Sequence, residues 1–207
     1  MNKIYYISQG KNPENHIFNI KVVLEAGCKL IQLRLKNVDD TVYLDSAIKV
    51  KQMCVKYGAK LIINDNVFVF MNSGADGIHL GKKDACPLEI RKKASHKIIG
   101  ATANTYNDCV ALINKKVDYI GLGPYHFTKT KNNLSPILGK EKIEEIVLQL
   151  KDELNFSAIY LIGGITSADF LAISDLNISG VAISGSLTNL STKIIEQRIN
   201  KFEQLKK

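Results

Sequence analysis

The chain has 207 residues, of which 45% are hydrophobic and only four are proline, a composition that fits one globular domain with a substantial core and excludes a disordered chain. Its formal net charge is +8, yet the lysines form short pairs scattered among acidic residues and no basic run is interleaved with aromatic residues, so we expect no nucleic-acid partner. No apolar run reaches about 18 residues and no signal-peptide pattern is visible, so we expect a cytoplasmic protein with no membrane contact.

Eight short apolar stretches alternate with eight segments of helical periodicity. Strands are predicted at 3–8, 29–34, 61–63, 77–80, 97–101, 119–122, 158–162 and 181–183. Helices are predicted at 13–26, 39–57, 67–72, 87–94, 106–114, 140–150, 167–174 and 189–205. Continuously apolar strands indicate a parallel sheet that is buried on both faces. Eight strand–helix units favour a closed barrel, so we predict an α/β fold: a single compact (β/α)8 TIM-barrel domain over residues 1–207.

Polar residues follow the predicted strands, and the active site of such a barrel lies where strands end and helices begin. Arg34 and Lys36 alternate with leucines and so share one face of an extended segment, which places two cations toward the barrel mouth. Asn64 adds an amide donor at the end of the next strand. The pattern predicts an anion pocket here, although a solvated strand end is the alternative for either cation alone.

Two carboxylates, Asp65 and Asp84, end neighbouring strands beside these cations. A Mg²⁺ ion bridging them to a pyrophosphate would explain why they coexist, because Mg²⁺ prefers one or two carboxylates together with substrate oxygens and water. Each aspartate also precedes a predicted helix and could instead serve as its N-cap. Both interpretations remain open from the sequence.

A second anion pocket is predicted at the last two strands. Gly163-Gly164 follows the seventh strand and Ser184-Gly185-Ser186 follows the eighth. Barrels commonly bind phosphate through backbone N–H groups of these two loops and a helix N-terminus.

The connection after the sixth strand, residues 123–139, is the longest one, and long loops in compact domains often act as lids or binding loops. Thr128, Thr130 and Lys131 lie in it, and hydroxyl and ammonium groups close to a strand end are suited to phosphate. Among the histidines, His79 on a buried strand is more typical of a packed core residue than of a base, and His16 is predicted at the surface.

In combination, these segments resemble the thiamine phosphate synthase family and, more broadly, the superfamily that it shares with the thiazole tautomerases. The matching segments are Gln32–Lys36, Leu61–Asp65, Gly74–Gly81 with Asp84, Ile99–Gly100, Asp118–Pro124 with Thr128–Lys131, Ile162–Ile165 and Gly180–Ser184. They occur in order over nearly the whole chain, which makes the resemblance far more specific than any one motif.

The resemblance implies a transferase that joins an aminopyrimidine methyl pyrophosphate to a thiazole phosphate, giving thiamine phosphate and pyrophosphate, with Mg²⁺ as cofactor. It also implies a dissociative route, in which pyrophosphate leaves before the thiazole nitrogen attacks. The implied roles are Gln32 for the pyrimidine; Arg34, Lys36, Asn64 and Lys131 for the pyrophosphate; Asp65 and Asp84 for Mg²⁺; Thr102 near the reacting groups; Thr128 and Thr130 for the thiazole; and Gly163, Ile183 and Ser184 for its phosphate. The catalytic set would be Arg34, Lys36, Thr102 and Lys131.

The chain departs from the family pattern at four positions. Leu35 replaces a common glutamate, Asn66 an arginine, Asn104 a histidine and Leu161 a glycine. The first two departures remove opposite charges together, which suggests that one structural ion pair has been lost.

Two other functions remain open from the sequence. One is a thiazole tautomerase, which binds only the thiazole phosphate and has no need for two cations and two carboxylates together. The other is a non-catalytic binding protein for a phosphorylated ligand on the same barrel. In each case the partners would be small phosphorylated molecules, and a homodimer is also compatible with the sequence.

Overall fold

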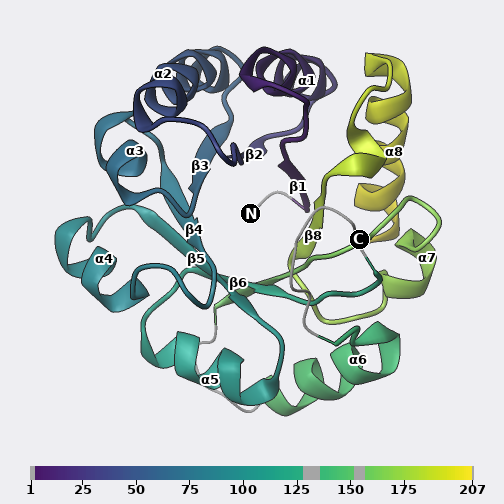
Figure 1. The fold of residues 1–207 in the computed structure, drawn as a ribbon. Coiled ribbons are helices and arrows are strands. Elements are labelled where there is room, and N and C mark those ends of the chain that lie inside the picture. The colour runs from purple at the N-terminus through teal and green to yellow at the C-terminus, as the bar shows by residue number, and fades with distance from the viewer. Residues whose placement is uncertain (1–2, 128–135, 152–156, 207) are drawn as a thin grey trace.

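The computed structural model describes residues 3–127, 136–151 and 157–206. Eight parallel strands close into a barrel in which each strand pairs with its neighbours in sequence and the last pairs with the first. Helices alternate with the strands and surround the barrel, which Figure 1 shows along its axis. The predicted (β/α)8 barrel is confirmed.

The strands are β1 (Ile4–Ile7), β2 (Leu30–Leu33), β3 (Lys60–Asn64), β4 (Gly77–Leu80), β5 (Ile98–Ala103), β6 (Tyr119–Leu122), β7 (Ala158–Leu161) and β8 (Gly180–Ile183). The helices are α1 (Pro13–Glu25), α2 (Asp40–Lys56), α3 (Val67–Asn72), α4 (Pro87–Lys93), α5 (Tyr106–Asn114), α6 (Gly139–Leu150), α7 (Phe170–Ile173) and α8 (Thr192–Leu205), with a short 3₁₀ turn, η1 (Gly185–Leu187), after β8. The bounds of β4, β6, α3 and α5 are as predicted.

The largest differences from the predicted bounds lie at the starts of α7 and α8. Asn189 has a φ of 58°, which is incompatible with a right-handed helix, so α8 begins only at Thr192. Before α7, the Asp169 carboxylate accepts hydrogen bonds from the Thr166 N–H at 2.8 Å and from the Thr166 hydroxyl at 2.9 Å. These bonds hold a turn where the sequence predicts the first helical residues.

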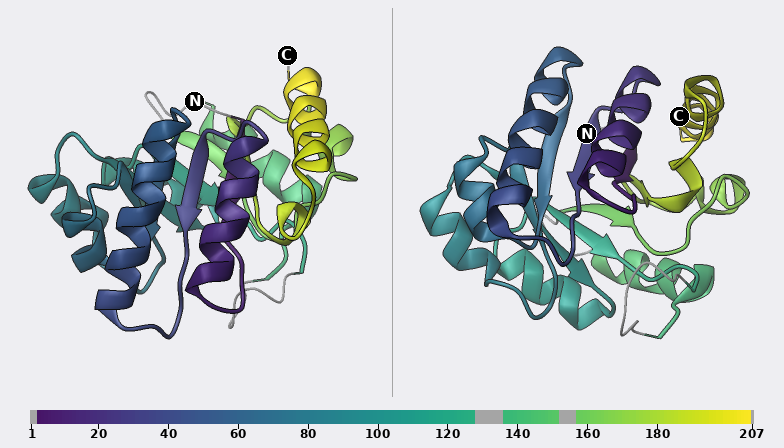
Figure 2. Two further views of the ribbon diagram at one scale, coloured as in Figure 1. Left: turned by 90° about the horizontal axis from the view of Figure 1, so that it is seen from above. Right: turned by 45° about the horizontal axis from the view of Figure 1, so that its top comes forward.

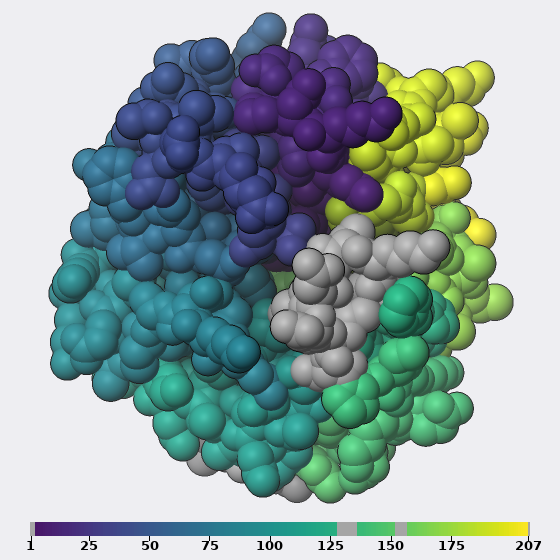
Figure 3. Space-filling model, in the orientation of Figure 1, coloured from purple at the N-terminus to yellow at the C-terminus, as the bar shows by residue number. Residues whose placement is uncertain are grey.

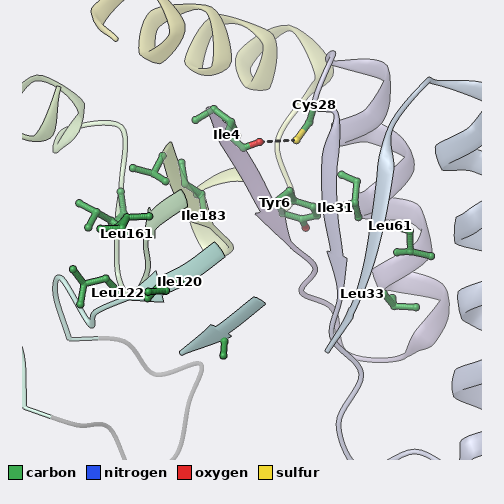
Figure 4. Close-up of a cluster of buried hydrophobic side chains, with 14 of the residues drawn as sticks. Ile4, Tyr6, Cys28, Ile31, Leu33, Leu61, Ile120, Leu122, Leu161 and Ile183 are labelled. Carbon is green, nitrogen blue, oxygen red and sulfur yellow. Dashed lines mark hydrogen bonds between the residues drawn. The ribbon is translucent and has the colours of Figure 1, made fainter. Parts of the chain in front are cut away.

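Alternate strand residues face the surrounding helices and form the larger part of the core. Figure 4 shows Ile31 and Leu33 on β2 and Leu61 on β3 pointing from the sheet toward the helices, and all three are fully buried. The other residues of each strand face the barrel interior. Because both faces are covered, the strands are continuously apolar, as the sequence shows.

Three tyrosine rings fill much of the barrel interior, where branched aliphatic side chains are more common. Tyr5, Tyr119 and Tyr160 pack edge to face, with ring centroids 5.6–5.7 Å apart. A Cβ atom at Gly100 would lie 2.0 Å from Cζ of Tyr119. Glycine on β5 therefore makes the room that the Tyr119 ring occupies.

The loops that follow the strands lie together at one end of the barrel, as the side view in Figure 2 shows. The start of β1 and the end of α8 lie at the opposite end, where Lys3 Nζ donates to the Lys206 carbonyl at 2.9 Å. Within the described part of the chain, no helix is long and apolar enough to cross a membrane.

Asp76 joins α2, β3 and the segment before β4 at the end of the barrel away from these loops. Its Oδ2 accepts hydrogen bonds from Lys51 Nζ at 2.7 Å and from the Leu61 N–H at 2.8 Å. Burial disfavours its ionised form, but these hydrogen bonds outweigh burial and lower the Asp76 pKa. We predict that Asp76→Ala lowers the free energy of unfolding by about 1–3 kcal/mol at neutral pH, measured by urea denaturation.

The effect of Asp76→Ala should depend on pH in a fixed direction. Because the folded-state pKa is lowered, the stabilisation by this carboxylate is present above the unfolded-state value of about 3.9 and is lost as pH falls through the folded-state value. The difference from wild type should therefore shrink in acid. Glu89→Ala, which removes only an exposed pair with Lys92, is the matched control and should leave stability nearly unchanged. A difference that stays undiminished in acid would contradict the ionic role of Asp76.

Candidate functional site

The carboxyl ends of β2, β3 and β4 bring a cation and two carboxylates together. Lys36, in the segment after β2, forms an ion pair with Asp65, which directly follows β3. Asp65 has a φ of 61°, an uncommon backbone conformation for a residue other than glycine. Its N–H donates to the carbonyl of His79 on β4 at 2.9 Å. The pairing of β3 with β4 thus continues past the strand end and fixes where the Asp65 side chain points.

The carboxyl groups of Asp65 and Asp84 lie within hydrogen-bonding reach of each other. Burial opposes ionisation of Asp65, but the contacts with Asp84 and Lys36 outweigh burial and lower the Asp65 pKa. For Asp84, burial and then the neighbouring Asp65 raise the pKa. The pair therefore consists of two like charges that favour a counterion, with Asp65 as the more acidic member.

Neither aspartate caps a helix. Asn66 is the N-cap of α3, because its Oδ1 accepts a hydrogen bond from the Val69 N–H at 2.9 Å. Cys86 precedes α4, whereas Asp84 accepts from the Gly81 N–H at 2.6 Å. The N-cap interpretation of both aspartates is wrong, and each carboxylate instead faces the other.

The facing carboxylates fit a Mg²⁺ ion. Mg²⁺ prefers oxygen ligands, needs only one or two carboxylates and takes its other ligands from water and substrate phosphates. Asp65 and Asp84 offer such a pair beside Lys36, and Mg²⁺ would offset the effects of burial and of the neighbouring Asp65, which together raise the Asp84 pKa. Within residues 3–127, 136–151 and 157–206, no cluster of three or more His, Cys, Asp or Glu side chains is arranged for a metal.

Asn64, the last residue of β3, carries a buried donor for which the described part of the chain offers no acceptor. The residue is 7% exposed, yet its Nδ2 has no hydrogen-bond partner among the described residues. Leaving a buried amide unpaired costs about 1–3 kcal/mol, so such groups are rare unless a ligand completes them. An oxygen of an anion bound beside Lys36 would supply the missing acceptor.

Arg34 is held through its backbone at the end of β1. Its N–H donates to Ser8 Oγ at 3.0 Å, and the same hydroxyl lies 2.8 Å from His16 Nδ1 on α1. His16 is buried, so its prediction as a surface residue is wrong. Burial lowers the His16 pKa, and the charge of Arg34 lowers it further. The spacing of the strands along the sequence does not reveal that Ser8 and His16 support this segment.

Gln32, His79 and Thr102 lie in the interior of the barrel, just inside its mouth. Gln32 Nε2 donates to the Tyr5 hydroxyl at 2.6 Å, and His79 Nε2 lies 3.0 Å from Thr102 Oγ1. His79 is the buried histidine that the sequence predicts, but its hydroxyl partner was not predicted. Sequence reasoning also misses Tyr5 and Tyr119, although they alternate along their strands with the outward-facing Tyr6 and Ile120, which is the signal that would place them inside the barrel.

The loops after β7 and β8 meet the connection after β6 and the loop after β1. Gly163 has a φ of 90°, and a Cβ atom there would lie 2.6 Å from Cβ of Pro124. Ser184 Oγ donates to Gln9 Oε1 at 3.4 Å. The Ile183 side chain belongs to the outer cluster between sheet and helices (Figure 4), so any contact of Ile183 with a ligand would involve its backbone.

A cavity of about 560 Å³ opens beside Ser184, between the loops after β1 and β8. Its lining consists of Gln9, Gly10, Lys11, Asn15, Phe18, Asn19, Gly185, Thr188 and Asn189. The sequence does not predict the residues after β1 as part of a site. They become neighbours of the β8 loop because β8 pairs with β1 when the barrel closes.

The predicted residues Thr128, Thr130 and Lys131 lie outside the described residues. At the near end of the same connection, Asn104 Nδ2 donates to the Gly123 carbonyl, and His126 Nε2 lies 2.8 Å from Asp169 Oδ1.

Figure 3 shows the end of the barrel where the loops after the strands lie, with a hollow near its centre beside the purple and blue N-terminal segments.

The departures from the family pattern have structural roles in this chain. Leu35 and Leu161 are buried in the outer core. Asn66 caps α3 and also donates through Nδ2 to Asp40 Oδ1 at 2.6 Å, and Asn104 holds the Gly123 carbonyl. These positions therefore pack and pair locally, and the lost ion pair stays a prediction.

A family model described as thiamine monophosphate synthase matches residues 4–187. The chain is 44% identical to a thiamine-phosphate synthase of Flavobacterium psychrophilum over 188 residues, which cover 90% of this chain and 91% of the relative. It is 41% identical to that of Flavobacterium johnsoniae over 201 residues, covering 96% and 95%.

A solved structure, the thiamine phosphate pyrophosphorylase from Pyrococcus furiosus, has the same fold. It aligns with a TM-score of 0.85 at 23% identity, over 98% of this chain and 96% of that chain. Together with the family match over most of the chain, these findings show that the chain belongs to the thiamine monophosphate synthase family and is a transferase enzyme of thiamine biosynthesis.

Proposed function

We propose that this enzyme joins an aminopyrimidine methyl pyrophosphate to a thiazole phosphate, giving thiamine phosphate and releasing pyrophosphate. The observation that carries this proposal is the group at the ends of β3 and β4. Asp65 and Asp84 face each other, Lys36 pairs with Asp65, and Asn64 presents a buried donor that no described residue satisfies. A pyrophosphate accompanied by Mg²⁺ satisfies all four residues. A tautomerase that binds only a thiazole phosphate has no need for them.

Stabilisation of the leaving pyrophosphate would be the main catalytic task of the protein. Arg34 and Lys36 would bind its oxygens as cations, and Asn64 Nδ2 would donate to another oxygen. Lys131 is proposed as a further cation for the same group. Mg²⁺ held by Asp65 and Asp84 would neutralise the negative charge that develops as the pyrophosphate departs.

The two organic groups would lie between this site and the loops after β7 and β8. Gln32 and Thr102 are proposed to contact the pyrimidine from inside the barrel mouth. Gly163, Ser184 and the Ile183 backbone are proposed to bind the thiazole phosphate, as barrels often do at these loops. Thr128 and Thr130 keep their proposed role beside the thiazole ring.

We favour a dissociative route, in which the bond between the pyrimidine methylene and the pyrophosphate breaks before the thiazole nitrogen attacks. The cations and donors gathered around the departing group support this route. Thr102 has an imidazole partner, but the other nitrogen of His79 bonds to the Tyr119 phenol at 3.0 Å rather than to a carboxylate. The residues would thus act by charge stabilisation and by holding two substrates in position.

The reaction assay tests the proposed function. The purified protein should form thiamine phosphate from both substrates with Mg²⁺ and should form none without it. Asp65→Asn and Asp84→Asn should each lower kcat by about 100-fold or more, because each removes a group that stabilises developing charge. Product formation is measured over a range of Mg²⁺ concentrations. Asp175→Asn, which alters an exposed pair with Lys140, is the control and should keep the wild-type rate.

Two outcomes would count against this proposal. Absence of product from the wild-type protein at every Mg²⁺ concentration would sink the synthase function. Wild-type rates in both aspartate variants would show that the metal site has been placed on the wrong residues.

Asn64 offers a test by binding and stability alone. Asn64→Leu replaces the unpaired amide by an apolar side chain of similar size, so it should raise the free energy of unfolding by up to about 1–3 kcal/mol. The same change should weaken binding of inorganic pyrophosphate with Mg²⁺ by about tenfold or more, measured by calorimetry.

The matched control is Asn19→Leu, because Asn19 is also buried but its Nδ2 donates to the Gln9 carbonyl at 2.9 Å. That change should destabilise the protein. Equal destabilisation by Asn64→Leu would mean that the Asn64 amide already has its partner within the protein.

A further inference from the structure

A chain of four hydrogen bonds crosses the barrel interior and joins side chains from five strands. Gln32 Nε2 on β2 lies 2.6 Å from the Tyr5 hydroxyl on β1, which lies 2.9 Å from the Tyr119 hydroxyl on β6. The Tyr119 hydroxyl lies 3.0 Å from His79 Nδ1 on β4, and His79 Nε2 lies 3.0 Å from Thr102 Oγ1 on β5. The chain thus begins and ends at two residues that are proposed to contact the pyrimidine.

All of these side chains are withdrawn from water, so their polar atoms need partners within the protein. None of the five residues is more than 8% exposed. Breaking one link would leave buried donors and acceptors unpaired, which costs more than a bond at the surface. An apolar interior of branched aliphatic residues would fold without this risk. A functional role therefore explains these buried hydrogen bonds better than packing does.

Two glycines make room for the Tyr119 and His79 rings. A Cβ atom at Gly100 would lie 2.0 Å from Cζ of Tyr119, and one at Gly121 would lie 3.1 Å from Cε1 of His79. The His79 and Tyr119 rings stack, with centroids 5.5 Å apart and planes 24° from parallel. The strands on both sides are thus shaped to hold the two rings in a single arrangement.

The hydrogen bonds have a direction. Gln32 Nε2 can only donate, so the Tyr5 hydroxyl accepts from it and its own hydrogen needs another acceptor. Either hydroxyl of the Tyr5–Tyr119 pair can donate, and the Tyr119 oxygen, 2.9 Å away, is the acceptor that the Tyr5 hydrogen reaches. The Tyr119 hydroxyl in turn donates to His79 Nδ1. An imidazole that accepts at Nδ1 carries its hydrogen on Nε2, so His79 donates from Nε2 to Thr102. Because Thr102 accepts this bond, its own hydroxyl hydrogen is left to serve a partner in the site.

We propose that Tyr119 is a positioning residue for the transfer reaction: its phenol fixes the Nε2–H tautomer of His79 and thereby sets the Thr102 hydroxyl as a hydrogen-bond donor toward the pyrimidine substrate. This inference rests on the proposed function, because that function places Thr102 beside the pyrimidine. Tyr5 has the corresponding role for Gln32, whose amide it orients from the other end of the chain.

Tyr119→Phe tests the proposal, because it keeps the ring and removes the hydroxyl that links the Gln32–Tyr5 hydrogen bond to the His79–Thr102 hydrogen bond. We expect kcat to fall about tenfold or more, the cost of one misplaced hydrogen bond in the transition state. Binding of inorganic pyrophosphate with Mg²⁺ should stay within about twofold of wild type, because none of the residues proposed to bind pyrophosphate belongs to this series of hydrogen bonds. Tyr160→Phe is the matched control, because it removes the hydroxyl of the neighbouring interior tyrosine, which is not among the four hydrogen bonds described above. We expect it to have a much smaller effect on kcat.

The tautomer of His79 is read without any substrate by ¹⁵N NMR of the imidazole nitrogens, with the signals assigned by substituting the histidines one at a time. Wild type should show hydrogen on Nε2 alone. Tyr119→Phe should show a mixture of both tautomers, whereas Tyr5→Phe should keep the Nε2–H form, because Tyr119 can still donate to Nδ1. Tyr5→Phe also serves as a second variant if Tyr119→Phe does not fold.

The outcomes separate this inference from the proposed function. An unchanged tautomer in Tyr119→Phe, or equal losses of kcat in Tyr119→Phe and Tyr160→Phe, would overturn the positioning role. If the tautomer shifts as expected while wild type forms no thiamine phosphate, the chain of bonds orients Thr102 as stated and the proposed reaction alone is wrong.

Discussion

The repulsion between Asp65 and Asp84 is the constraint on which the functional site depends. Two carboxyl groups within hydrogen-bonding reach of each other favour a cation between them, and Lys36 offsets only part of their charge from one side. The protein holds this arrangement with a left-handed backbone at Asp65 and a tight turn at Asp84. Structural strain and unpaired polar groups persist mainly where a ligand or a reaction makes use of them.

The barrel supplies the rigidity that this arrangement requires. Asn64 pairs in register with His79, so the residues that follow these two strands are fixed relative to each other. The same register places His79 above the interior tyrosines, where it bonds to Tyr119. The charged site at the mouth and the buried hydrogen-bond chain beneath it are therefore two layers of one structure. Changes in the interior are therefore expected to affect the proposed reaction without contacting the proposed pyrophosphate site.

Much of the fold follows from the sequence, because continuously apolar strands alternating with amphipathic helices leave few arrangements other than a parallel barrel. The same rule brings Arg34, Lys36, Asn64 and the two aspartates to one end. The sequence could not decide between metal ligand and helix cap for the aspartates, since both roles need a carboxylate just after a strand. Contacts across the barrel, such as those of His16 and Tyr119, were missed because they join residues that are far apart in sequence.

The most direct test of the account is a crystal structure of the enzyme with Mg²⁺ and pyrophosphate bound. We expect a cation in contact with oxygens of both Asp65 and Asp84, and a pyrophosphate oxygen within hydrogen-bonding distance of Asn64 Nδ2. Pyrophosphate bound elsewhere, with the Asn64 amide still unpaired and the two carboxylates bridged by no ion, would contradict it.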